Sequence, residues 1–246
     1  MTFIITVFGA GGKTGQECVK AALAKGDSVR AVVRDVKKYE GSFAAAPSSS
    51  SEVKLELIAG DVTAPPEQIK NLIAGSSAII FAASASKAGS VWEVDRDGLA
   101  NVAAAAKDTL SRVVVVSSAL VSPHNGWHPV RMILNNIRGR GQKIMDAKFE
   151  GENLLRATGC DYIVIRPGGL TDAAPLGASA LKVTQGDRNG ASQIARRDVA
   201  ELCVAAAHVG SEASGVTLEV CSDARREKTD IGYESLFVGL EKDQSI

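Results

Sequence analysis

The stretch from Thr2 to Arg34 most constrains what this chain can fold into. An apolar run, Thr2–Phe8, precedes a glycine cluster, and the helical stretch that follows leads to a second apolar run, Ser28–Val33. Apolar runs rich in β-branched residues are typical of strands buried inside a parallel sheet. A strand, a glycine turn, a helix and a strand in this order form a βαβ unit. Such a unit predicts a binding site for a dinucleotide pyrophosphate.

The spacing of the glycines departs from Gly-x-Gly-x-x-Gly, because Thr14 occupies the place of that pattern's last glycine. The pattern that fits is Gly9-x-x-Gly12-x-x-Gly15. Glycines allow a tight turn and a close approach of the backbone to phosphate, and a helix N-terminus offers unpaired N–H groups. A structural turn beside an empty crevice is the alternative interpretation. The expected cofactor contacts in this loop are Gly9, Gly11, Gly12, Lys13, Thr14 and Gly15.

Composition bounds the class of protein. The 246 residues are 45% apolar and 23% charged, which suits one large α/β domain with a substantial core and excludes global disorder. Lys plus Arg equals Asp plus Glu at 28 each, and no basic block stands out. The charge distribution therefore gives no indication of nucleic-acid binding. The four cysteines are scattered without the paired spacing of metal sites, so we expect reduced thiols and no metal.

No stretch reaches the roughly 18 apolar residues that a transmembrane helix needs. We recognise no signal or transit segment before the first apolar run. We therefore expect a soluble intracellular protein, either in the cytoplasm or, if a transit segment has been removed, in an organelle matrix or stroma.

The alternation of strands and helices continues along the whole chain. Further strands are predicted at Val53–Ala59, Ala78–Ala82, Arg112–Val116, Asp161–Arg166 and Gly215–Cys221. The predicted fold class is α/β, a Rossmann-type doubly wound parallel sheet of about seven strands with helices on both faces. We expect a single domain over residues 1–246, with a small C-terminal substrate or lid portion from about 167 to 246.

Arg34 bears on the choice of cofactor, because the end of the second strand faces the adenosine ribose in dinucleotide enzymes. An acidic residue there holds the ribose hydroxyls, whereas an arginine accommodates a 2′-phosphate. The planar guanidinium suits phosphate, and Lys13 adds a second charge, so NADP(H) is favoured over NAD(H). A solvated loop arginine is the alternative, and the neighbouring Asp35 keeps it open.

From the glycine loop onward the chain resembles the short-chain dehydrogenase/reductase superfamily, in particular its atypical, NmrA-like group. The stretch Val94–Asn101 is similar to the Val-Asp-x-x-Gly-x-x-Asn signature of extended and atypical members. The strand ending in Arg166-Pro167-Gly168-Gly169-Leu170 is similar to another signature of atypical members. The resemblance covers roughly residues 3–222.

The resemblance implies a cofactor crevice formed by several strand ends. Asp61 would accept from the adenine amine and Val62 would cover the ring, although Asp61 as a helix or turn cap is a serious alternative. Ala82 and Ala83 are small and would leave room for the cofactor. The remaining expected contacts are Ser117, Lys148, Pro167, Gly168 and Gly169.

The catalytic residues of active relatives are only partly present. Those relatives use a Ser or Thr after the fifth strand and a Tyr-x-x-x-Lys pair on the next helix, where the lysine lowers the pKa of the tyrosine that acts as general acid. Ser118 fits the serine and Lys148 the lysine, but Ile144 occupies the place of the tyrosine. An isoleucine has no proton to give.

Other acids are conceivable at this point. The chain has three tyrosines, Tyr39, Tyr162 and Tyr233, and none falls in the expected place. Two alternatives stay open: a proton relay through Ser118, His124 or His128, or Tyr233 acting as the general acid in place of the missing tyrosine.

Two functional hypotheses from different classes follow. The first is an NADP(H)-binding protein without the usual catalytic tyrosine, serving as a redox sensor, an assembly factor or an accessory subunit. The second is an active NADPH-dependent oxidoreductase that acts on a small carbonyl or enone. Beyond the dinucleotide, the resemblance allows a homodimer or attachment to a larger protein complex as partners.

Overall fold

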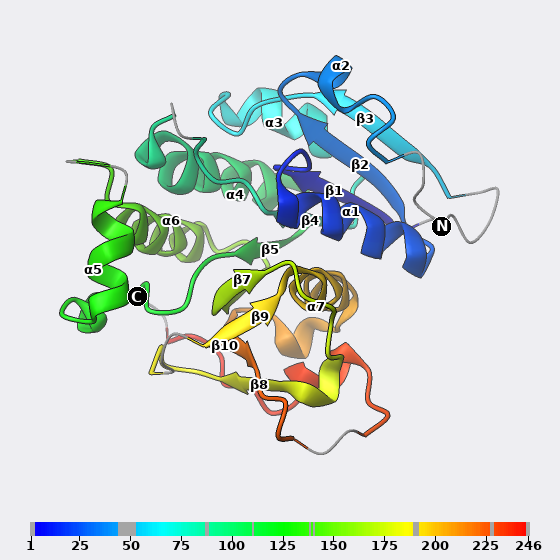
Figure 1. Ribbon diagram of the computed structural model, residues 1–246. Helices are drawn as coiled ribbons and strands as arrows, with labels where there is room; N and C mark the ends of the chain where they lie inside the picture. Colours follow the sequence, from blue (N-terminus) through cyan, green and yellow to red (C-terminus); the bar gives the residue numbers. More distant parts are fainter. Residues whose placement is uncertain are drawn as a thin grey trace.

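The computed structural model describes residues 3–43, 53–86, 89–109, 111–137, 139, 141–188, 192–226 and 229–244. Its centre is one sheet with helices on both faces (Figure 1). The strand order is β3-β2-β1-β4-β5-β6-β10-β8. The bounds are β1 Ile4–Phe8, β2 Ser28–Val33, β3 Leu55–Ala59, β4 Ala78–Phe81, β5 Arg112–Val116, β6 Tyr162–Pro167, β8 Leu181–Thr184 and β10 Val216–Ser222.

The sheet winds outward from its middle in both directions. From β1 the chain proceeds through β2 to β3 on one side, and from β4 through β5 and β6 on the other, with parallel pairing throughout. This is the doubly wound order, in which ligands bind at the carboxyl ends of the strands where the order reverses. Here that point lies between β1 and β4. The prediction of a Rossmann-type fold is confirmed.

The predicted count of about seven strands is slightly wrong. An eighth strand, β8, pairs antiparallel with β10 at the sheet edge. Two further strands, β7 at Gly169–Thr171 and β9 at Gln193–Ala195, form a separate parallel pair. The sequence does not reveal these strands because each has only three or four residues, too few for a hydrophobic period to stand out.

The helices cover the two faces of the sheet in separate groups. Helices α1 and α7 pack against each other on one face, whereas α3, α4 and α6 line the other (Figure 1). A π-helical turn at Trp92–Asp97 runs directly into α4, and the short helices α2 and α5 follow β2 and β5. The bounds are α1 Lys13–Lys25, α2 Val36–Tyr39, α3 Pro66–Ile73, α4 Gly98–Thr109, α5 Pro129–Asn136, α6 Ile144–Thr158 and α7 Arg196–His208.

Two apolar cores result from the alternation of side chains along the strands. Ile5 and Val7 of β1 belong to the core beneath α1 and α7, whereas Phe8 belongs to the core beneath α3, α4 and α6. The second core is built partly from small residues of α4, which let that helix lie close to the sheet. Among the described residues, no helix is long and apolar enough to cross a membrane.

Candidate functional site

The glycine loop after β1 is held in place by backbone contacts that a side chain would break. Gly9 has φ +77°, and a Cβ there would lie 2.6 Å from the backbone of Ala83, in the segment that follows β4. A Cβ at Gly15 would lie 2.1 Å from the carbonyl oxygen of Gly9. The two loops at the reversal point of the sheet therefore touch backbone to backbone, with Ala82 still bonded to Phe8 through its N–H at 3.0 Å.

The N-terminus of α1 points into this loop without a cap of its own. Gly12 is the capping residue, no side chain of the described chain accepts from the first turn, and that turn contains no acidic residue. Its N–H groups and the positive end of the helix dipole are thus available to an anionic group. The loop fits a dinucleotide pyrophosphate, because it combines close backbone approach with unpaired donors.

Tyr39 covers part of the loop, a contact that the sequence did not reveal. A Cβ at Gly11 would lie 2.4 Å from Cζ of Tyr39, so the tyrosine ring lies directly on that glycine. Tyr39 ends α2, whose first turn is capped by Asp35, the acceptor of the Lys38 N–H at 3.3 Å. The sequence signal that could have indicated this contact is Asp35, a residue type that caps helices. The helix that it caps carries Tyr39 back over the glycine loop.

Arg34 lies at the carboxyl end of β2, exposed, and bonds to no residue that the structure describes. Its neighbour Asp35 caps α2 and is thereby occupied. Lys13 behaves differently, since its ammonium lies 2.8 Å from Asp172, a carboxylate that also binds Arg196. The hydrogen bond from Lys13 lowers the pKa of Asp172. This pair is exposed and therefore weak, so Lys13 can exchange it for another anion.

At the end of β3, Asp61 has the alternative role considered above. One oxygen of its carboxylate accepts from both the N–H and the hydroxyl of Thr63, each at 3.0 Å, so Asp61 caps the turn. Val62 is buried against Gly98, where a Cβ would lie 2.7 Å from its Cγ2. Asn101 donates to the carbonyls of Val62 and Ala64 at 3.4 and 3.2 Å and fixes the same turn. A contact of Asp61 or Val62 with adenine stays a prediction.

Lys148 is paired with a carboxylate inside the protein. Its ammonium lies 2.8 Å from Oδ1 of Asp95, whose side chain is fully buried, and Lys148 itself is 14% exposed. The other oxygen of Asp95 accepts the N–H of Ala85 at 3.0 Å, just after β4. Gly151 permits this arrangement, because a Cβ there would lie 2.4 Å from the carbonyl oxygen of Asp95. The Asp of the family signature thus acts as the partner of Lys148.

The position of the missing tyrosine is apolar. Ile144 is the first residue of α6 and packs against Leu120, Val121 and Met145. The hydroxyl of Ser118, the expected catalytic serine, donates to the carbonyl of Ala119 at 3.0 Å. Neither residue offers an acid to a substrate in this arrangement.

Ser117 faces the protein interior and not the crevice. Its hydroxyl donates to Glu152 at 2.5 Å, and Glu152 also accepts from Arg166 at 2.6 and 3.1 Å and from Arg156 at 3.0 Å. Burial opposes ionisation of the fully buried Glu152, but the two guanidinium groups outweigh it and lower the pKa of this carboxyl. The expected cofactor contact of Ser117 would therefore run through its backbone, since its side chain is engaged.

Tyr162, Tyr233 and His124 are engaged elsewhere, whereas the buried Nδ1 of His128 has no hydrogen-bond partner among the described residues. Tyr162 donates its hydroxyl to Asp243 at 3.0 Å, and Tyr233 donates to Asp198 at 2.7 Å. Burial, together with these carboxylates, raises the pKa of both phenols well above the usual value. Nε2 of His124 lies 3.2 Å from the carbonyl oxygen of Asp187.

The residues after β6 carry the loop expected beside the nicotinamide. Gly168 donates to Val220 at 2.9 Å and Gly169 to Ser192 at 2.7 Å, which secures the segment on both sides. A Cβ at Gly168 would lie 2.1 Å from the carbonyl oxygen of Ser192, so only glycine fits. Pro167, Gly168 and Gly169 thus lie where β6 leaves the sheet, at the same carboxyl edge as the glycine loop.

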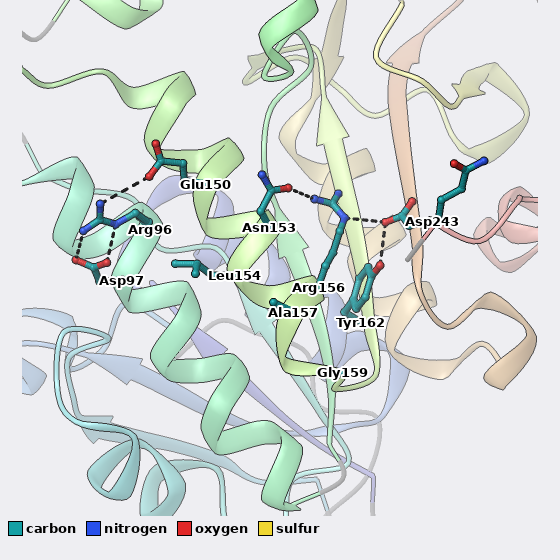
Figure 2. Close-up of a pocket in the computed structure, with 11 residues that line it drawn as sticks. Arg96, Asp97, Glu150, Asn153, Leu154, Arg156, Ala157, Gly159, Tyr162 and Asp243 are labelled. Carbon is teal, nitrogen blue, oxygen red and sulfur yellow. Dashed lines mark hydrogen bonds and ion pairs between the residues drawn. The ribbon is translucent and has the colours of Figure 1, made fainter. Parts of the chain in front are cut away.

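A cavity of about 880 Å³ lies elsewhere in the molecule (Figure 2). It lies along α6 and reaches Gly159 at the C-terminal end of that helix, whereas the glycine loop lies at the carboxyl edge of the sheet. Arg156, Tyr162 and Asp243 meet there, and each polar group finds a partner within the protein. None of the expected site residues lines this cavity. The described residues contain no cluster of metal-ligating side chains.

Comparison with known proteins identifies the family. A family model described as NAD(P)H-binding matches residues 9–209. The chain belongs to this NAD(P)H-binding family. This match agrees with the resemblance to atypical, NmrA-like short-chain dehydrogenase/reductases that the two signatures indicated.

A relative from Arabidopsis thaliana, named as an uncharacterized chloroplastic protein, is 32% identical over 248 residues, which cover 96% of this chain and 82% of the relative. Two solved structures share the fold. An anaerobillin reductase from Escherichia coli O157:H7 superposes with a TM-score of 0.71 at 19% identity, covering 92% of this chain and 100% of that one. A short-chain dehydrogenase/reductase from Veillonella parvula DSM 2008 in complex with NADP has a TM-score of 0.64 at 17% identity, covering 94% and 100%.

Proposed function

We propose that this protein binds NADP(H) at the carboxyl edge of the sheet and does not perform tyrosine-dependent carbonyl chemistry. It acts instead as an NADP(H)-responsive redox sensor, assembly factor or accessory subunit. One observation carries the proposal. Lys148, which would lower the pKa of a catalytic tyrosine, is neutralised by the buried Asp95, and the apolar Ile144 takes the tyrosine's place.

Arg34 supports the preference for NADP(H) over NAD(H). It is exposed beside the glycine loop, and its neighbour Asp35 is occupied as a cap, so its guanidinium is available to a 2′-phosphate. The NADP complex of the Veillonella parvula structure agrees with a cofactor of this kind on this fold. In the same proposal, Asp61 and Val62 flank the adenine, and Ala82, Ala83 and Pro167–Gly169 line the rest of the crevice.

The compartment follows from the relative and is part of the proposal. The Arabidopsis protein is named as chloroplastic. We propose a corresponding setting for the present protein, an organelle matrix or stroma, or else the cytoplasm. Fractionation of cells that express a tagged full-length chain would test this placement.

The nucleotide proposal is tested by calorimetric titration with NADPH and NADH. Arg34→Ala should weaken NADPH binding about tenfold to a hundredfold, the loss of one or two charge-assisted hydrogen bonds, and leave NADH binding unchanged. Lys37→Ala, an exposed cation on α2, is the matched control and should have little effect. Equal loss for both nucleotides, or no effect of Arg34→Ala, would contradict the assignment.

The absence of tyrosine-dependent chemistry is tested by turnover. Wild-type protein that binds NADPH tightly should oxidise it no faster than the uncatalysed rate with small aldehydes and ketones. Measurable ketone reduction that disappears in Lys148→Met would overturn this part of the proposal while leaving the binding part intact.

A second candidate is reduction of a conjugated, electron-poor acceptor. Such an acceptor makes less demand on an acid, because the substrate's own electronics stabilise the charge that develops. Ser118 and Lys148 are both retained, and the anaerobillin reductase shows that this fold accommodates a reductase. NADPH oxidation with enones that is lost in Lys148→Met would favour this candidate.

A further inference from the structure

Helices α1 and α7, which pack side by side, each begin with a cation (Figure 1). Lys13 is the first residue of α1 and Arg196 is the first residue of α7. Both cations bind the same carboxylate: the ammonium of Lys13 lies 2.8 Å from Oδ2 of Asp172, and the guanidinium of Arg196 contacts Oδ1. The N-termini of the two helices therefore lie together, and with them the positive ends of two helix dipoles.

This corner of the molecule has little other negative charge to compensate it. The capping residues of the two helices are Gly12 and Ala195, and neither has a side chain that accepts a hydrogen bond from the first turn. The acidic residue in the first turn of α7, Asp198, is fully buried and accepts the N–H groups of Leu176 and Gly177 at 2.9 and 3.0 Å. Among the described residues, Asp172 is thus the one carboxylate that both cations bind.

Asp172 lies at a place where its side chain can leave without a change of fold. It directly follows β7, which is fixed by its pairing with β9, and Asp198 holds the chain again at Leu176 and Gly177. The side chains of Asp172 and Lys13 are 63% and 72% exposed. Exposed ion pairs contribute little to stability, so a rotation of the Asp172 side chain releases both cations at small cost.

A phosphate group has the chemistry to take the place of this carboxylate. Lys13 and Arg196 bind the two oxygens of one carboxylate, and they can likewise bind two oxygens of one phosphate. Helix N-termini favour the same ligand, because they offer unpaired N–H groups to an anion. Lys13 directly follows Gly12 of the glycine loop, so the corner adjoins the place where that loop fits a pyrophosphate.

We propose that Arg196, together with Lys13, binds the pyrophosphate of the nucleotide and that Asp172 is an internal competitor for this site. The inference rests on the proposed NADP(H) function and adds a binding residue and a regulatory contact to it. Binding of the nucleotide displaces Asp172 from the two cations. The exposed segment 172–176 thereby loses its contact with the glycine loop, so the nucleotide changes a surface that a partner protein can read.

Calorimetric titration of variants with NADPH and NADH tests the competition. Asp172→Asn should bind both nucleotides about threefold to tenfold more tightly, and by the same factor, because both carry the same pyrophosphate. This distinguishes it from Arg34→Ala, which should affect NADPH alone. Arg196→Met should weaken binding of both about threefold to tenfold. In Asp172→Asn/Arg196→Met the gain from the first change should fall to about twofold or less, because the cation for which Asp172 competes is gone.

Glu234→Gln is the matched control. Glu234 is an exposed carboxylate that pairs with Lys25 at 2.7 Å, at the opposite end of α1, and the variant changes the net charge by the same amount. Its nucleotide affinities should equal those of the wild type. An unchanged affinity in Asp172→Asn, an equal gain in Glu234→Gln, or a gain that persists in full without Arg196 would overturn the inference.

Inorganic pyrophosphate separates this inference from the proposed function. Asp172→Asn should bind pyrophosphate more tightly than the wild type does, and circular dichroism verifies that each variant is folded. That gain without any binding of NADPH would leave the competition standing and refute the nucleotide assignment. NADPH binding that Asp172→Asn does not strengthen would refute the competition alone. Absence of binding of both NADPH and pyrophosphate would overturn both proposals.

Discussion

The buried charges around Arg166 allow one prediction to be worked out in detail. Three carboxylates pair with this guanidinium, Glu152, Glu219 and, at 3.9 Å, Asp187, and all three are essentially inaccessible to solvent. Glu152 receives two hydrogen bonds from Arg166 and others from Arg156 and Ser117, whereas Glu219 contacts Arg166 at 3.3 Å. The second oxygen of Glu219 finds no hydrogen-bond partner in the described part of the chain. Replacing Glu152 by Gln should therefore change the stability of the protein differently from replacing Glu219 by Gln.

Glu152→Gln should destabilise the protein by about 3–5 kcal/mol, because Arg166 loses its shortest carboxylate contact and keeps only Glu219 at 3.3 Å and Asp187 at 3.9 Å. The variant keeps the shape of the side chain but removes the one charge that two arginines share. Glu219→Gln should change stability by less than about 1 kcal/mol or raise it, because Arg166 retains Glu152 and a poorly solvated charge disappears. The first variant should lower Tm by roughly 6–20 °C in a domain of this size.

The pH dependence follows from the opposite pKa shifts. Burial raises the pKa of Glu152, but its interactions with Arg166 and Arg156 outweigh burial and leave that pKa lowered. Its stabilisation is therefore present above the ordinary glutamate pKa and is lost as pH falls below it. Burial raises the pKa of Glu219, so its folded form holds a proton longer and stability falls as pH rises past the ordinary value. Glu219→Gln should therefore remove a loss of stability that the wild type shows on going from mildly acidic to neutral pH.

Urea unfolding followed by circular dichroism measures these differences, with unchanged m-values as evidence of a comparable transition. Glu150→Gln is the control on the same helix, since Glu150 is 51% exposed and its pairing with Arg96 is weak. Equal destabilisation by Glu152→Gln and Glu219→Gln, or a larger effect of the latter, would refute the reasoning.

Three further predictions concern the packing of the site. Gly151→Ala should destabilise the protein by about 1–3 kcal/mol, measured by urea unfolding, because its Cβ would meet the Asp95 carbonyl at 2.4 Å; an unchanged midpoint would show that α6 can shift freely. Asp95→Asn and Lys148→Met should each destabilise the protein by about 3 kcal/mol, and the double variant should destabilise it by clearly less than the sum of the two. Additive effects in this double-mutant cycle would disprove the pairing of Lys148 with Asp95. Tyr39→Ala should change the NADPH affinity in calorimetry about tenfold, since the ring covers Gly11, whereas an unchanged affinity would place Tyr39 outside the nucleotide site.

The parts of the fold that the sequence predicted are those in which neighbours along the chain determine the structure. The βαβ unit at Thr2–Arg34 and the parallel sheet follow from local runs and glycine spacing. The turn-capping role of Asp61 was likewise within reach as an alternative, since Thr63 lies two residues away.

The parts that escaped prediction depend on contacts between distant segments. Ser117 turns toward Glu152, 35 residues further on, and no pattern around either residue announces that pairing. The contacts of Tyr39 with Gly11 and of Lys148 with Asp95 were not predicted for the same reason. Each contact joins two elements that only the folded sheet brings together. A motif identifies which residue types a family keeps, whereas their partners are determined by packing.

The contacts of Asp243 have a consequence for how the chain is made. This carboxylate accepts from Arg156 at 3.0 Å, from Tyr162 at 3.0 Å and from Thr217 at 2.6 Å, which joins α6, β6 and β10. Synthesis proceeds from the N-terminus, and domains generally fold as units as they emerge. Arg156 therefore lacks its second carboxylate partner until residue 243 has left the ribosome. A nascent chain that stalls earlier lacks the contacts of Asp243 that join α6, β6 and β10, and its sheet is more accessible to chaperones and proteases.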